Sequence, residues 1–141
     1  MMNPDFESEM KEIPAFLYQT AGLDVSAGIS YCGDAEDYLF AVKAFQERVE
    51  ENAAEIEKYR LAGDMNNMAV KVHGVKSTSR AIGALELGDL AERIEKAGKE
   101  DRDIPDTDID KFLIMCTRYA GQSLISITIN SPLSFPRNHL L

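Results

Sequence analysis

One histidine with basic and hydroxyl-bearing neighbours stands out as a candidate for chemistry. His73 is followed by Lys76, Ser77 and Arg80. Because side chains three and four residues apart share a helix face, these four are expected to lie along one side of a single helix. A histidine between cations is a poor general base, since positive neighbours lower the pKa of its imidazole. It suits instead a neutral nucleophile that takes up an anionic group, and phosphate is the natural candidate.

The segment around His73 has the pattern of an amphipathic helix. Its inner stripe is predicted from residues at three- and four-residue spacing, namely Met65, Met68, Val72, Val75, Ser79 and Ile82. Asp64 is an N-cap candidate, and Gly83 is expected to serve the following turn or a close helix contact. We therefore predict a helix over residues 65–82 that positions His73.

The sequence around this histidine resembles a known family signature. The run reads His73-x-x-Lys76-Ser77-x-x-x-x-Ile82-Gly83-Ala84. It is similar to the phosphohistidine signature of histidine-containing phosphotransfer (HPt) domains, which are four-helix bundles that relay phosphoryl groups in two-component signalling. The resemblance covers roughly residues 22–119. The sequence departs from the family signature at Ser77, where the family often has glycine. Serine is still small enough to let a partner approach the histidine.

The resemblance implies roles for four side chains. His73 is the phosphoacceptor, through a solvent-facing Nε2, and Lys76 neutralises charge on the phosphoryl oxygens; an ordinary solvated lysine is the alternative for Lys76. A return helix over residues 85–99 brings Glu95 and Lys99 back to the level of the histidine, at about 1.5 Å per residue. Glu95 is then a candidate to orient the imidazole or hold Lys76, and Lys99 to contact phosphate. A surface salt bridge is the competing interpretation of both.

Other residues near the histidine have two interpretations each. The small residues Ala69, Gly74 and Ser77 would let a partner domain approach closely, although helix tolerance also explains them. Arg80 either attracts an acidic partner surface or is a solvated side chain. Gly83 is expected to have a structural role.

The remaining pattern predicts an all-α protein, an antiparallel four-helix bundle with additional N-terminal helical segments. We expect a helical extension over residues 1–21, interrupted at Pro14, the bundle over 22–121 and a separate segment over 122–141. The other helices are predicted over 25–32, from Asp34 to Tyr59, over 85–99, and from a cap at Thr107 or Asp108 to Ala120. Leu39 and Leu113 are expected on inner stripes.

The C-terminal segment does not continue the helical pattern. Residues 123–129 are rich in β-branched side chains, and residues 131–141 contain two prolines. An additional helix, an extended chain over the bundle and association with another copy all remain open.

The composition limits which partners and which cellular compartment are expected. The 141 residues are 45% apolar, which suits one domain with one core. A net charge of -9 argues against nucleic acid or an anionic membrane as the main partner. Cys32 and Cys116 are interpreted as reduced thiols, and neither a signal peptide nor a membrane-spanning run is recognised. We expect a cytoplasmic protein.

The resemblance to HPt domains, together with the chemistry expected of His73, implies a phosphorelay intermediate. His73 is expected to accept a phosphoryl group from a receiver-domain aspartate and pass it to another receiver, with response-regulator receivers or a hybrid sensor histidine kinase as partners. The sequence has no Gly-rich nucleotide loop, so no autokinase activity is expected. No cofactor or metal is expected on this chain, because the receiver supplies Mg²⁺. One alternative is a helical module that binds or sequesters a partner without phosphorylation. Another, a bundle enzyme with a cofactor or di-metal site, is disfavoured by the apolar inner stripes.

Overall fold

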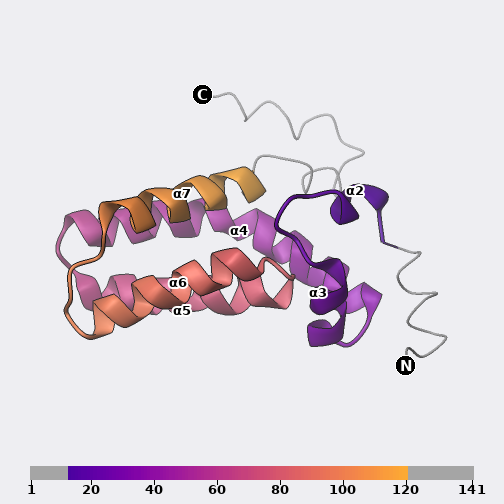
Figure 1. The fold of residues 1–141 in the computed structure, drawn as a ribbon, viewed down its shortest axis with the longest axis horizontal. Helices are drawn as coiled ribbons and strands as arrows, with labels where there is room; N and C mark the ends of the chain where they lie inside the picture. Colours follow the sequence, from indigo (N-terminus) through magenta and orange to yellow (C-terminus); the bar gives the residue numbers. More distant parts are fainter. Residues whose placement is uncertain (1–12, 121–141) are drawn as a thin grey trace.

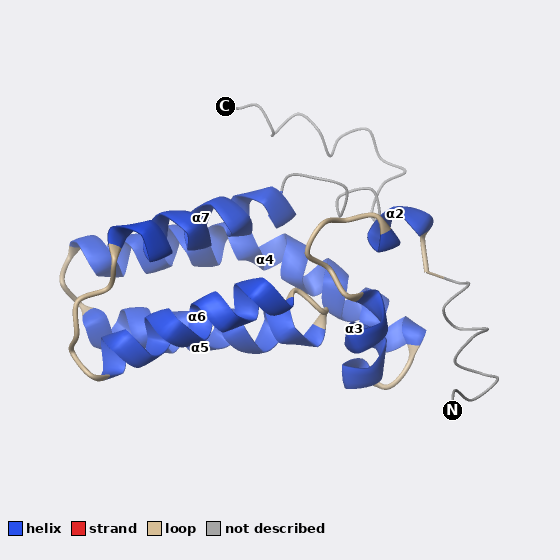
Figure 2. Ribbon diagram, viewed as in Figure 1, coloured by secondary structure: helices blue, strands red, loops and turns tan. Residues whose placement is uncertain are grey.

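The computed structural model describes residues 13–120, and this part of the chain contains six helices and no strand. The four long helices are α4 (Ala35–Leu61), α5 (Met65–Ala81), α6 (Leu85–Lys99) and α7 (Asp106–Ala120). They run side by side along the longest axis of the molecule, and the short helices α2 (Ala15–Tyr18) and α3 (Val25–Cys32) lie at one end (Figure 1). Only loops connect these helices (Figure 2). The predicted all-α bundle is confirmed.

The bundle is closed by pairwise helix contacts around one core. α4 packs against α5 and α7, and α6 packs against the same two helices, while α3 contacts α4 and α5. The largest fully buried side chains are Tyr38, Phe112, Leu17, Ile29, Ile56, Met68, Ile82, Leu87, Leu90, Ile94 and Ile109. Each long helix thus buries one apolar stripe.

Aspartate caps begin three of the helices, and the cap at Asp64 is one that the sequence predicts. The side chains of Asp24, Asp34 and Asp64 accept hydrogen bonds from the backbone N–H three residues later, at 3.0, 2.8 and 3.2 Å. Each bond satisfies one of the N–H groups that a helix N-terminus leaves unpaired.

Two predicted core positions are only half-buried, and one predicted cap is wrong. In α4, Leu39 packs half-buried against the core, while the neighbouring Tyr38 is fully buried and its hydroxyl donates a hydrogen bond to the Ile82 carbonyl oxygen. In α7, Leu113 likewise packs half-buried against the core, and Met115 is buried.

The predicted cap of α7 at Thr107 or Asp108 is also wrong, because the helix begins at Asp106. The Pro105 carbonyl accepts from the N–H groups of Asp108 and Ile109 and thereby satisfies two donors of the first turn. Residues 1–12 and 121–141 lie outside the described residues, and with them most of the expected N-terminal extension and the whole expected C-terminal segment. Within the described residues, α2 follows Pro14. The three-part division of the chain stays a prediction.

The C-terminal end of α5 is anchored by three successive carbonyl groups, at residues 81–83. In order, their oxygens accept hydrogen bonds from Cys32 Sγ (3.3 Å), Tyr38 Oη (2.8 Å) and the Asp24 backbone N–H (2.8 Å). Gly83 has a φ of +87°, and a Cβ atom there would collide with the Asp24 carbonyl oxygen. The turn that follows α5 therefore needs glycine at residue 83 for both conformation and space.

Alanine substitution separates these two requirements. Gly63, in the turn between α4 and α5, has a φ of +75° but open space around a Cβ atom. Gly63→Ala is expected to cost about 1–2 kcal/mol, from the left-handed conformation alone. Gly83→Ala is expected to cost about 1–3 kcal/mol more, because it adds overpacking. Urea unfolding of both variants measures the difference, and equal losses would contradict the close approach.

Candidate functional site

His73 lies on α5 where this helix packs closely against α6. The contact is made by small residues, since a Cβ atom on Gly98 would lie 3.4 Å from Ala69 Cβ and 3.2 Å from Met68 Cε. Ala69 is buried. The interpretation of Ala69 as a residue that gives a partner access is therefore wrong, and its small size serves the packing of two helices.

The imidazole of His73 contacts a buried carboxylate on α6. His73 Nδ1 lies 2.8 Å from Glu95 Oε2. Lys76 Nζ lies 2.8 Å from Glu95 Oε1, and Lys99 Nζ lies 2.7 Å from Glu95 Oε2. The Glu95 side chain is only 5% exposed, so its pairs are not an ordinary surface salt bridge. The hairpin thus brings these four side chains together, as the sequence predicts.

The charge of Glu95 decides which imidazole nitrogen carries the hydrogen. Burial by itself raises the pKa of Glu95, but hydrogen bonds from Lys76, Lys99 and His73 outweigh it and lower that pKa to about 2. An ionised carboxylate only accepts hydrogen bonds. Nδ1 of His73 therefore donates to Glu95, and in the neutral ring the lone pair lies on Nε2. The His73 side chain is 56% exposed, which leaves the ring open to a partner.

The two lysines differ in their surroundings. Lys76 is half-buried one turn after the histidine, whereas Lys99 is exposed one turn after Glu95. Both cations lie at the same carboxylate that orients the imidazole, and so both lie close to the ring. Their positions favour charge stabilisation of an anion at His73.

Arg80 has partners that the sequence analysis did not assign. Its guanidinium lies 3.0 Å from Asp89 Oδ1 and 2.6 Å from Glu92 Oε1, both on α6. The aliphatic part of Arg80 covers Gly88, where a Cβ atom would lie 2.6 Å from Arg80 Cγ. Arg80 therefore ties α5 to α6, and its charge is balanced by two carboxylates.

The surface beside His73 is formed by small side chains and is partly apolar. Gly74 and Ser77 are exposed, and a Cβ atom on Gly74 would meet no other atom within 4 Å. Val70, one turn before the histidine, is 69% exposed. Val70 is not among the predicted site residues, although its three-residue spacing from His73 places it on the same face of the helix.

No helix among residues 13–120 is both long and apolar enough to cross a membrane. The same residues contain no group of three or more His, Cys, Asp or Glu side chains arranged to hold a metal ion.

The low pKa of Glu95 predicts an acid-dependent loss of stability. The folded-state pKa lies below the ordinary value of 4.5, so the unfolded chain binds the proton first as the pH falls. The stabilisation is complete above about pH 5 and is lost as the pH falls toward 2. We expect the stability advantage of the wild type over Glu95→Gln to shrink by on the order of 1–3 kcal/mol across this window. Urea unfolding at several pH values measures it, and parallel curves for the two proteins would contradict the assignment.

Comparison with known proteins places the chain in a family. A family model described as the Hpt domain matches residues 41–121, which include His73, Lys76, Glu95 and Lys99. Searches among curated proteins and among solved structures found no match. The family model covers more than half of the chain and includes Glu95 and its three partners. This protein therefore belongs to the Hpt domain family.

Proposed function

We propose that His73 accepts a phosphoryl group from the aspartyl phosphate of a receiver domain and passes it to the aspartate of another receiver. Hpt domains are phosphotransfer modules that interact with receiver domains in phosphorelays, and they are not kinases. The observation that carries the assignment to His73 is its hydrogen bond to the buried, ionised Glu95.

The proposed step needs no proton transfer on this chain. Nε2 of the neutral ring attacks phosphorus, an N–P bond forms, and the P–O bond to the receiver's aspartate breaks to release its carboxylate. Because Nδ1 keeps its hydrogen, the phosphorylated ring is positively charged, and the Glu95 carboxylate 2.8 Å away balances that charge. The reverse transfer needs only a second receiver with a free aspartate.

Lys76 and Lys99 supply the charge that the phosphoryl oxygens need. Phosphoryl transfer depends mainly on positioning and electrostatic stabilisation, so two cations beside an oriented nucleophile are sufficient local help. In this proposal Mg²⁺ belongs to the receiver, and Lys76 and Lys99 act from the Hpt side.

The surface around His73 suits a transient partner. Exposed Val70 offers an apolar contact, Gly74 and Ser77 leave room for close approach, and Lys99 adds a positive charge. An interface of this mixed kind is expected to be weak and to exchange partners rapidly.

The first test is incubation with a phosphorylated receiver domain. Acid-labile, base-stable phosphate is expected on the wild type and on His139→Gln, the control at the other histidine, and none on His73→Gln. If receivers bind but none phosphorylates His73, the bundle is a binding module without transfer chemistry, which is the alternative function.

A second test addresses Glu95. Glu95→Ala removes the acceptor of the Nδ1 hydrogen bond and is expected to slow transfer by about 10–100-fold, because the ring loses its orientation. Single-turnover transfer from a phosphorylated receiver measures the rate.

The matched control is Glu92→Ala, one turn earlier on α6, because Glu92 pairs with Arg80 and not with the histidine. It is expected to transfer at close to the wild-type rate. Equal rates for wild type and Glu95→Ala would dispose of the orienting role.

A further inference from the structure

The hydrogen on Nδ1 of His73 matters again when a phosphoryl group leaves the ring. As the P–N bond at Nε2 breaks, its electron pair stays on Nε2, and a new P–O bond forms to the aspartate of the next receiver. A ring that still carries its Nδ1 hydrogen leaves as neutral imidazole. A ring that has lost this hydrogen leaves as the imidazolate anion, which is a far poorer leaving group.

Glu95 is placed to keep this hydrogen on the phosphorylated ring. Its Oε2 lies 2.8 Å from His73 Nδ1, and its side chain is only 5% exposed, so water screens the contact little. Burial raises the pKa of Glu95, but hydrogen bonds from Lys76, Lys99 and His73 outweigh it and lower that pKa to about 2. An ionised carboxylate at this distance favours the positively charged form of the ring.

The charges around His73 balance only when the phosphorylated ring stays positive. A phosphoryl group carries about two negative charges at neutral pH. Lys76 and Lys99 supply two positive charges beside it, and Glu95 supplies one negative charge. Loss of the Nδ1 hydrogen would therefore leave an unbalanced negative charge in a partly buried site, which costs free energy.

Two further ion pairs on α5 are closed among themselves. Arg80 lies 2.6 Å from Glu92 of α6, and Lys71 lies 2.6 Å from Glu55 of α4. Each of these charges already has a partner of its own. Among the described residues, Glu95 is therefore the carboxylate that acts on the ring.

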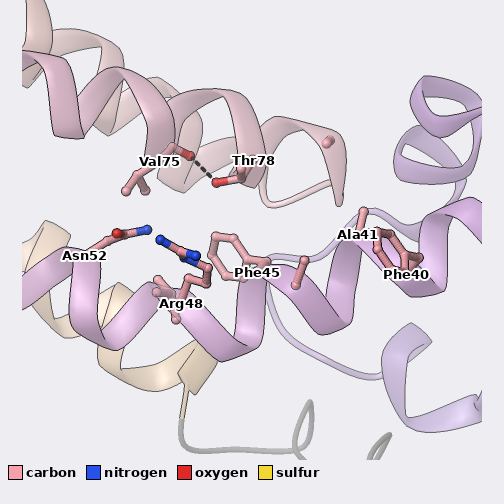
Figure 3. Close-up of a pocket in the computed structure, with 10 residues that line it drawn as sticks. Phe40, Ala41, Phe45, Arg48, Asn52, Val75 and Thr78 are labelled. Atoms are coloured by element: carbon pink, nitrogen blue, oxygen red, sulfur yellow. Dashed lines mark hydrogen bonds between the residues drawn. The ribbon is translucent and has the colours of Figure 1, made fainter.

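The charged side chains of α4 face a different side of α5. An apolar pocket lies between the two helices, and Figure 3 shows Arg48 of α4 opposite Val75 and Thr78 of α5. At about 100° per residue, Val75 and Thr78 lie on the side of α5 away from His73. α3 also contacts α5, and it contains no charged side chain.

We propose that the negative charge of Glu95 holds the Nδ1 hydrogen on the phosphorylated ring and so keeps the phosphoryl group ready to leave at neutral pH. This role rests on the proposed function and differs from orientation. An uncharged acceptor also orients the ring, but only a carboxylate opposes the loss of the proton. His73 is then a rapid donor to the next receiver and not a store of phosphate.

The protonation of the ring is measured by ³¹P NMR of the phosphorylated full chain. In the His139→Gln background His73 is the one histidine, and phosphoramidate, a small-molecule phosphoryl donor, labels it without a receiver. The ordinary pKa of an imidazole is about 6.5. In the folded protein we expect the resonance to stay at the position of the protonated ring from about pH 6 to 8, and in urea we expect it to titrate within this range.

Glu95→Gln removes the charge but keeps an oxygen that accepts from Nδ1. Its phosphohistidine resonance is expected to titrate in the folded protein as it does in urea. The matched control is Glu92→Gln, which removes the same charge one turn earlier on α6 and is expected to behave as the wild type.

Transfer from phosphorylated His73 to an unphosphorylated receiver gives the functional readout. The ratio of the wild-type rate constant to that of Glu95→Gln is expected to rise by up to about tenfold from pH 7 to 8, because the variant has to regain a proton before each transfer. A purely orienting role predicts a ratio that does not change with pH, and that result would contradict the proposal.

Three NMR results would overturn the inference: a wild-type resonance that titrates in the folded protein, a Glu95→Gln resonance that does not, or a His73 that phosphoramidate leaves unlabelled. The comparison of folded and urea-unfolded wild type needs no variant, so it holds even if Glu95→Gln fails to fold. Because the label comes from phosphoramidate, the NMR result stands whether or not a receiver phosphorylates His73. Failure of the proposed function is thus recognised separately.

Discussion

The site depends on one buried carboxylate that has three donors. An ionised carboxylate loses several kcal/mol of hydration on burial unless charged or hydrogen-bonding partners replace the water. Glu95 has partners from both helices of the hairpin, namely His73 and Lys76 from α5 and Lys99 from α6 itself. This arrangement exists only when α5 and α6 are in one register at close distance, which the Ala69–Gly98 contact permits.

The same interaction connects the fold to the chemistry. A carboxylate that stays ionised at neutral pH holds the hydrogen on Nδ1, so Nε2 is prepared for attack before any partner arrives. The end of α5 is held independently, by the carbonyl groups of residues 81–83. The helix that carries the nucleophile is therefore fixed laterally by the Glu95 contacts and at its C-terminal end by these hydrogen bonds, while the imidazole remains more than half exposed.

Helical periodicity, together with the resemblance to HPt domains, was sufficient to predict the bundle and its hairpin. The rise per residue also placed Glu95 at the level of His73. The level of a residue along the hairpin depends only on its distance from the turn, and the sequence pattern locates the turn and the two helices well. Side-chain partners across helices were harder to predict. The burial of Ala69 and the pairing of Arg80 depend on how closely α5 approaches α6, which no periodicity within a single helix reports.

The hydrogen-bonded state of the imidazole tests the account most directly. Long-range ¹⁵N–¹H NMR of the ¹⁵N-labelled chain distinguishes the two neutral tautomers of the His73 ring. The account predicts that Nδ1 carries the hydrogen and Nε2 is unprotonated, and that Glu95→Ala lets the ring return toward a mixture. A ring with its hydrogen on Nε2 in the wild type would contradict it, because that nitrogen would then have no lone pair with which to attack phosphorus.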